Sequence, residues 1–126
     1  MRRRSELTPP GWHRVTPRIV ADDADGLVAF LARVFDATGA PRDGAPTELW
    51  IGDSVILISD ADARRPMPAF LYVYVHDADA AYRRALDAGA RSLEAPAEMP
   101  YGDRRAMVED RWGNTWQIAT YGSRES

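Results

Sequence analysis

Few side chains in this sequence suit covalent or proton-transfer chemistry. Its 126 residues include no cysteine, and every basic residue is arginine, which excludes thiolate nucleophiles, cysteine zinc sites and lysine Schiff bases. The two imidazoles belong to His13 and His76. His13 lies at the start of the first predicted strand and is a candidate for proton transfer or ligand contact. Glu48 is a candidate general base if it is buried. An ordinary surface position is the alternative for both, so the catalytic residues stay unassigned.

Aromatic side chains alternate with aliphatic ones along residues 70–75, FLYVYV, a composition typical of a β-strand. Because neighbouring side chains of a strand point to opposite faces, Phe70, Tyr72 and Tyr74 share one face. The aliphatic residues between them share the other face, which we expect to pack under the helices. A row of rings offers a planar ligand a large contact area with few rotatable bonds. The alternative is that these rings fill the interior or a dimer interface.

Further candidate ligand contacts lie on the other predicted strands. Arg18, which alternation places with Thr16, suits a carboxylate or phosphate, with a surface ion pair as the alternative. Trp50 shares one strand face with Glu48. Gln117 stands among apolar residues of the last predicted strand, where an amide usually fixes the orientation of a ligand.

The segment 99–105, MPYGDRR, predicts a loop with a glycine, a tyrosine and two arginines. Loops of this composition can act as lids over a rigid scaffold. Tyr101 and Arg104 are the ligand contacts that we expect from this loop.

A repeated order of secondary structure positions these residues. Each half of the sequence reads as β-α-β-β-β, with aspartate at the predicted helix start and glycine, Gly39 or Gly89, at the predicted helix end. Pro17 indicates an edge or a bulge in the first strand, and a loop is expected around Pro96 and Pro100. The predicted strands cover 13–21, 47–51, 54–59, 70–75, 104–109 and 115–120, and the predicted helices cover 24–37 and 78–88.

Two pairs of short matches support the repeat. Residues 23–25, DAD, match 77–79, DAD, and the turn at 52–54, GDS, matches 113–115, GNT. We therefore predict an α+β fold in which two β-α-β-β-β modules form a curled, cup-like mixed sheet. The predicted boundaries are a tail at 1–11, one domain at 12–122 with modules at about 12–60 and 68–121, and a tail at 123–126.

With this repeat, the chain resembles the vicinal oxygen chelate superfamily of glyoxalases, bleomycin-resistance proteins and extradiol dioxygenases, and its PhnB-like branch in particular. The resemblance spans nearly the whole chain after residue 12. It implies that the strands curl into a cup with the aromatic row on the concave face, and that the protein is a homodimer, as many members are.

The resemblance also locates where metal-dependent members hold a divalent ion. Carried over through the Asp and Gly landmarks, those positions fall on or near Thr16, Ile56, Phe70 and Gln117. None of these carries the His, Glu or Asp that such a site needs, so we expect neither a metal nor another cofactor. A site assembled from His13, Glu48 and His76 is the alternative, although His76 stands beside the predicted cap of the second helix.

Composition limits the remaining functions. A net charge of −3 and the lack of a basic stripe argue against nucleic-acid binding, and no stretch has the ~20 apolar residues of a membrane span. The N-terminus lacks the apolar region of a signal peptide, so we expect a cytoplasmic protein. The expected function is metal-independent binding or sequestration of a small, aromatic-containing molecule in the concave pocket. A metal-independent isomerase, lyase or cyclase is the alternative, and a metal-dependent glyoxalase or dioxygenase comes last.

Overall fold

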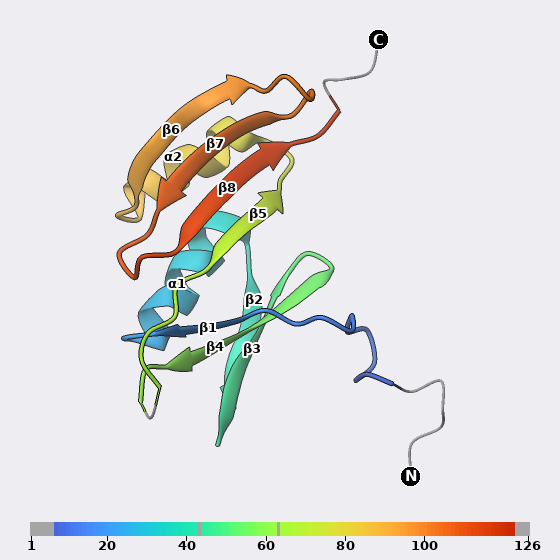
Figure 1. The fold of residues 1–126 in the computed structure, drawn as a ribbon, viewed down its shortest axis with the longest axis vertical. Coiled ribbons are helices and arrows are strands. Elements are labelled where there is room, and N and C mark those ends of the chain that lie inside the picture. The colour runs from blue at the N-terminus through green and yellow to red at the C-terminus, as the bar shows by residue number, and fades with distance from the viewer. Residues whose placement is uncertain (1–6, 43, 63, 123–126) are drawn as a thin grey trace.

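The computed structural model describes residues 7–42, 44–62 and 64–122, which form two modules with the same order of elements (Figure 1). The first module contains β1 (Arg18–Ala21), α1 (Ala24–Phe35), β2 (Thr38–Arg42), β3 (Ala45–Ile51) and β4 (Ser54–Asp60). The second contains β5 (Phe70–Tyr74), α2 (Ala78–Asp87), β6 (Arg91–Glu98), β7 (Arg104–Glu109) and β8 (Thr115–Thr120). The predicted α+β repeat is therefore confirmed.

Each module folds its strands into a separate four-stranded sheet. The strand orders are β1-β4-β3-β2 and β5-β8-β7-β6, and in each sheet the first strand runs parallel to the last strand of its own module. The remaining neighbours are antiparallel. The strands thus form two mixed sheets, where the sequence had suggested one shared sheet.

Side chains from each last strand hold the start of that module's helix. Asp23 and Asp77 are the N-caps, and each carboxylate accepts a backbone hydrogen bond, from Gly26 and Ala80 respectively, at 3.1 Å. The first helical amides, of Ala24 and Ala78, donate at 2.8 Å to the side chains of Asp60 in β4 and Thr120 in β8. Each helix start is therefore tied to the strand that ends its module.

The first helix ends earlier than its glycine suggested. α1 stops at Phe35, and Asp36 takes the left-handed conformation with φ 57°. Gly39 instead lies inside β2, where an added Cβ would come within 2.1 Å of the backbone oxygen of Glu48. Gly39 therefore allows the backbones of β2 and β3 to lie close together, and it does not end the helix. Gly89, with φ 103°, does follow the α2 cap at Ala88.

Two strand predictions also differ from the structure. β1 begins at Arg18 rather than residue 13, because Pro17 has no amide to donate, although its carbonyl accepts from Leu57 at 2.9 Å. β6 extends through Pro96, in a segment that the sequence had suggested to be a loop. The pairing of β6 with β7 shifts register between Glu94 and Ala97, and this irregularity accommodates the proline.

One hydrophobic core joins the two modules. The ring of Phe35 in α1 lies 5.5 Å from that of Trp116 in β8, and Phe30 lies 6.0 Å from Trp112, between centroids. Leu27 and Leu31 of α1 are fully buried in the same core, so α1 packs against both modules. None of the helices described here is long and apolar enough to cross a membrane.

Candidate functional site

The face of the second sheet turned away from α2 gathers most of the exposed aromatic rings. Leu71, Val73 and Val75 of β5 and its flank pack against the core, while their neighbours point the other way, as strand alternation predicts. Cross-strand pairing adds residues from β8 and β7 to the same face. We call this surface the tyrosine face, and it comprises Phe70, Tyr72, Tyr74, Arg105, Met107 and Gln117.

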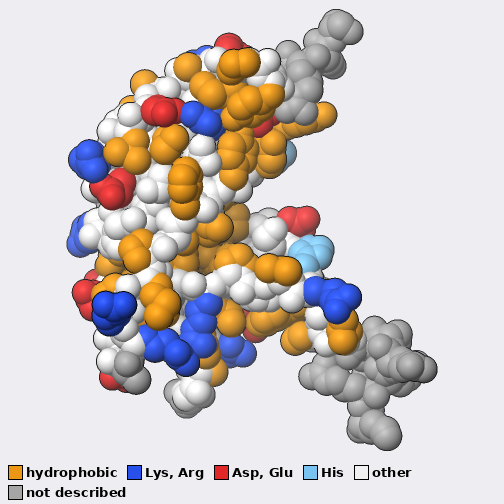
Figure 2. All heavy atoms as spheres, in the orientation of Figure 1, with side chains coloured by type: hydrophobic (Ala, Val, Ile, Leu, Met, Phe, Trp, Pro, Cys, Tyr) orange, Lys and Arg blue, Asp and Glu red, His pale blue; other side chains and the backbone are white. Residues whose placement is uncertain are grey.

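The rings of the tyrosine face remain largely open to solvent. Phe70 is 67% exposed and Tyr74 is 56% exposed. The Tyr72 and Tyr74 centroids are 5.3 Å apart, and Tyr121 stands edge-on to Tyr74 at 6.2 Å. Hydrophobic side chains gather over the second sheet beside the hollow between the modules (Figure 2). Such a cluster, with the polar Gln117 amide in its middle, suits a planar organic ligand.

A buried carboxylate organises the phenols of this face. Asp103, in the loop before β7, is 0% exposed, and its Oδ2 accepts from the Tyr72 hydroxyl at 2.6 Å and from the Tyr74 hydroxyl at 2.9 Å. The Tyr101 hydroxyl oxygen lies 3.1 Å from that of Tyr72. Burial raises the pKa of the Tyr72 phenol, and the hydrogen bonds to Asp103 and Tyr101 raise it further. Tyr72 therefore stays protonated at neutral pH.

The two arginines after this loop have different roles. Arg104 points to the helix side, where Nε and Nη2 bind the Asp79 carboxylate at 2.7 and 3.0 Å, and Nη1 lies 3.4 Å from Glu98. Arg105 belongs to the tyrosine face, with Nη1 donating to the Tyr101 hydroxyl at 3.3 Å and Nη2 paired with Glu94. Arg105, and not the predicted Arg104, is thus the arginine beside Tyr101.

The predicted ligand residues of the first module lie on the other sheet. Arg18 is exposed and donates from Nε to the Ser59 hydroxyl at 2.8 Å. Glu48 accepts from Trp50 Nε1 at 2.9 Å and lies 3.8 Å from the Arg42 guanidinium. The half-buried Thr16 precedes β1. The structure therefore divides the predicted site into two groups on separate sheets.

Trp50 and the histidines complete the placement of the predicted residues. The Trp50 ring meets the edge of the Trp12 ring at 6.5 Å between centroids, so the N-terminal segment covers part of it. His13 is exposed in that same segment. His76 is exposed next to the α2 cap and lines the cavity described below.

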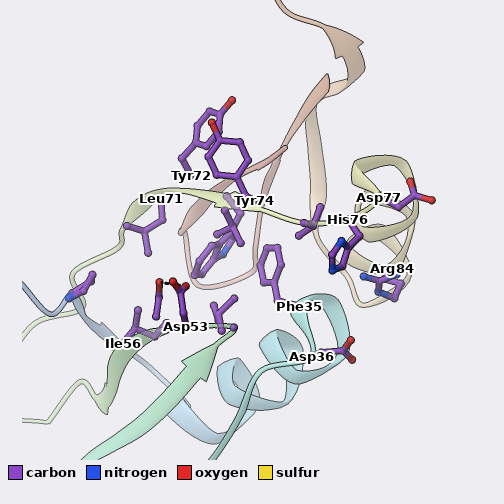
Figure 3. A pocket seen from close by; sticks show the side chains of 17 residues that line it. Phe35, Asp36, Asp53, Ile56, Leu71, Tyr72, Tyr74, His76, Asp77 and Arg84 are labelled. Carbon is purple, nitrogen blue, oxygen red and sulfur yellow. Dashed lines mark hydrogen bonds between the residues drawn. The ribbon is translucent and has the colours of Figure 1, made fainter. Parts of the chain in front are cut away.

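A cavity of about 640 Å³ lies between the modules, on the side of β5 opposite the tyrosine face. Its apolar wall includes Phe35, Leu71 and Trp116, and its polar rim includes Asp53 and Arg84 (Figure 3). Tyr72 and Tyr74 border it, but their rings point away from Phe35 in this view. Among the residues that the structure describes, the lining includes no predicted ligand contact from the first sheet.

The strand pairing corrects one of the positions carried over for metal ligands. Gln117 pairs with Tyr72 in the second module, and its counterpart that pairs with Arg18 in the first module is Leu57. Ile56 instead faces the core and is buried, because the hairpin between β7 and β8 is longer than that between β3 and β4. The corrected set, which is Thr16, Leu57, Phe70 and Gln117, still lacks the donors that a divalent ion requires. Within the described ranges, no group of three His, Asp or Glu side chains is placed to bind a metal ion.

Sequence reasoning missed Asp103, Arg105 and Glu94. The alternation of β7 could have located Arg105, because Ala106 and Val108 mark the core face and place residue 105 on the opposite one. Asp103 carried no such signal, since an aspartate beside a glycine in a loop usually faces solvent.

The fold and sequence identify the family of this chain. It belongs to the Glyoxalase/Bleomycin resistance protein/Dioxygenase superfamily, whose model matches residues 5–118. The uncharacterized protein Mb0911c of Mycobacterium bovis is 28% identical over 122 residues, covering 82% of this chain and 80% of that protein. The uncharacterized protein Rv0887c of Mycobacterium tuberculosis is equally similar and is covered over 72% of its length.

Solved structures share the fold at lower identity. TioX from Micromonospora sp. ML1 superposes with a TM-score of 0.73 at 22% identity, covering 87% of this chain and 99% of that one. A glyoxalase/bleomycin resistance protein/dioxygenase family enzyme from Burkholderia phytofirmans PsJN has a TM-score of 0.72 at 22% identity, over 83% and 95% of the two chains. Membership of the PhnB-like branch stays a prediction.

Proposed function

We propose that this protein binds a small, aromatic-containing organic molecule on the tyrosine face without a metal, and so carries or sequesters it. The observation that carries the proposal is the group of solvent-exposed rings on that face, formed by Phe70, Tyr72 and Tyr74. Exposed rings that stand together around one amide, that of Gln117, offer stacking surface and one orienting hydrogen bond.

The proposal is metal-free because of the side chains present at the family's ligand positions. Leu57 and Phe70 have no donor atom, while Thr16 and Gln117 offer only neutral oxygens. Purified protein should therefore bind the organic ligand equally well before and after treatment with a strong chelator. A stoichiometric divalent ion whose removal abolishes binding would contradict this part of the proposal.

Binding of indole, monitored by NMR shifts of the labelled protein, tests the site. We expect shifts centred on β5 and β8, and a loss of affinity of about tenfold or more in the double variant Tyr72→Ala/Tyr74→Ala, since each aromatic contact contributes about 0.5–1.5 kcal/mol. Val15→Ala, which changes an exposed apolar residue ahead of β1, is the matched control. Equal affinity in the two variants would refute the site.

We further propose that the protein is a homodimer in which the second copy shelters the exposed apolar side chains. Leu7, Met67 and Tyr121 are each at least half exposed in one chain. Surfaces of this kind are typical of interaction sites. Light scattering coupled to size-exclusion chromatography should give twice the 14.0 kDa chain mass, and a monomer at micromolar concentration would contradict the proposal.

A metal-independent isomerase, lyase or cyclase is the second candidate function. It is favoured by the buried Asp103 carboxylate bonded to the Tyr72 phenol, an arrangement that can hold and move a proton. The two functions differ in the response to Tyr72→Phe. A binder changes its affinity by a modest factor, whereas an enzyme loses turnover by ~10²–10⁴ with little change in ligand affinity.

A further inference from the structure

The cavity between the modules is a second compartment of the protein, next to the tyrosine face. Its volume of about 640 Å³ lies within the range of roughly 300–1,000 Å³ that is typical of small-molecule sites. Its apolar lining comes from both modules, with Leu71, Val73 and Trp116 from the second and Ile51 and Ile56 from the first. The two modules can therefore enclose an apolar group between them.

The charged groups around this cavity are mostly acidic. Its lining contains three carboxylates, one guanidinium and one imidazole, from Asp36, Asp53, Asp77, Arg84 and His76. The Arg84 guanidinium is turned to the end of α1, where Nε and Nη2 donate to the Val34 carbonyl at 3.3 and 2.9 Å. The lining thus carries an excess of negative charge, which attracts a cation and repels an anion.

Asp53 is the carboxylate of this set that points into the cavity. It lies in the turn between β3 and β4, and its oxygens point towards Leu71, whereas those of Asp36 and Asp77 point outwards (Figure 3). Among the ion pairs of the described residues, none involves Asp53, and the Ser54 hydroxyl donates to it at 3.2 Å. A carboxylate has about four acceptor sites, so Asp53 can accept further hydrogen bonds from a ligand.

From the apolar lining and the inward carboxylate we infer that this cavity binds a hydrophobic organic cation. The ammonium group of the ligand lies at Asp53, and its apolar body lies between Leu71 and Ile56. An ammonium group brings three donors to the carboxylate, and such charge-assisted hydrogen bonds are stronger than neutral ones. The site is additional to the one on the tyrosine face, and it does not depend on the proposed function.

Octylammonium and octanoate test the inference, because they share an alkyl chain and differ in the sign of their charge. NMR titration of the full-length protein with labelled methyl groups, at about pH 8 where imidazoles are neutral, should shift the signals of Ile51, Ile56 and Leu71. We expect octylammonium to bind about tenfold more tightly than octanoate. Equal affinity of the two probes would overturn the inference. So would the absence of shifts at these methyl groups, which is the result expected if a second copy of the chain fills the cavity.

Two variants separate pairing with Asp53 from the net charge of the protein. Asp53→Asn and Asp87→Asn each remove one carboxylate, but Asp87 is exposed at the end of α2 and does not line the cavity. Asp53→Asn should weaken octylammonium binding by about fivefold or more without weakening octanoate binding, and Asp87→Asn should change either affinity by less than about twofold. An equal loss of octylammonium affinity in the two variants would overturn the assignment of Asp53.

Discussion

Asp110 should contribute more to stability than any other single carboxylate in the second module. It is 4% exposed and directly follows β7, where its Oδ1 accepts from the backbone amides of Trp112 and Asn114, each at 2.9 Å. Its Oδ2 accepts from the Asn114 side-chain amide at 2.9 Å and from Trp116 Nε1 at 2.8 Å. One carboxylate thus satisfies four donors around the β7–β8 turn.

The magnitude for Asp110→Ala follows from which donors water can reach. Trp112 is half-buried, so its amide can be hydrated, whereas Asn114 and Trp116 are fully buried. Three donors are left without a partner at about 1–3 kcal/mol each. The variant also no longer buries a charged carboxylate, and this gain offsets part of the loss. The net loss of stability therefore lies in the lower part of the range summed over the three donors. We expect a decrease of about 3–5 kcal/mol in the free energy of unfolding, a large share of the roughly 5–15 kcal/mol of a typical domain.

Urea unfolding followed by tryptophan fluorescence measures this loss. The matched control is Asp53→Ala in the β3–β4 turn, where the exposed carboxylate accepts from the Ser54 hydroxyl at 3.2 Å and a change within about 0.5 kcal/mol is expected. Asp110→Asn, which keeps one acceptor oxygen, should fall between them. A loss below about 1 kcal/mol for Asp110→Ala, or one equal to that of Asp53→Ala, would refute the assignment of Asp110 as the organiser of this turn.

Three further predictions test other contacts. The Arg104 guanidinium lowers the pKa of the Asp79 carboxyl below its ordinary value of 3.8. This pair therefore stabilises the fold above that pH, and the melting temperatures of the wild type and Asp79→Asn should differ at pH 7 and converge as the pH falls below 3.8. Burial and the hydrogen bonds to Asp103 and Tyr101 raise the pKa of Tyr72, so Tyr72→Phe should leave the absorbance at 295 nm unchanged up to pH 10.0 and lower it only at higher pH, where the stabilising contribution of Tyr72 is also lost. Gly39→Ala places a methyl group 2.1 Å from the Glu48 carbonyl oxygen and should lower the free energy of unfolding by about 1–3 kcal/mol in urea.

The fold could be predicted because its signals are local and repeated. Asp23 and Asp77 mark the starts of the two helices as N-cap residues. The hydrophobic stripe of α1 identifies the buried face of that helix, and the alternation in β5 identifies the buried face of that strand. The end of the first helix was predicted wrongly from Gly39. A glycine is needed there because the backbone of β3 lies too close for a side chain, and no local sequence pattern reveals that contact.

The candidate site was less predictable because it depends on register and on a loop. Aligning the two modules on their glycine turns made Ile56 the equivalent of Gln117. Because the β7–β8 turn is longer than the β3–β4 turn, the residue that is structurally equivalent to Gln117 is Leu57, one position further along. A shift of one residue turns a side chain to the other face of a strand. Asp103 is buried only because the chain folds back over β5, so its role follows from tertiary structure rather than from sequence spacing.

Strand β5 lies between two compartments: Leu71 and Val73 line the cavity, whereas the rings of Phe70, Tyr72 and Tyr74 build the tyrosine face, and Tyr72 and Tyr74 also border the cavity. A five-residue strand at the border of its sheet has neighbours on one edge only, so its backbone can be displaced more readily than that of β8. Any substitution that moves this backbone to reshape one compartment therefore reshapes the other. Directed evolution of affinity on either side of β5 should thus yield correlated changes on both.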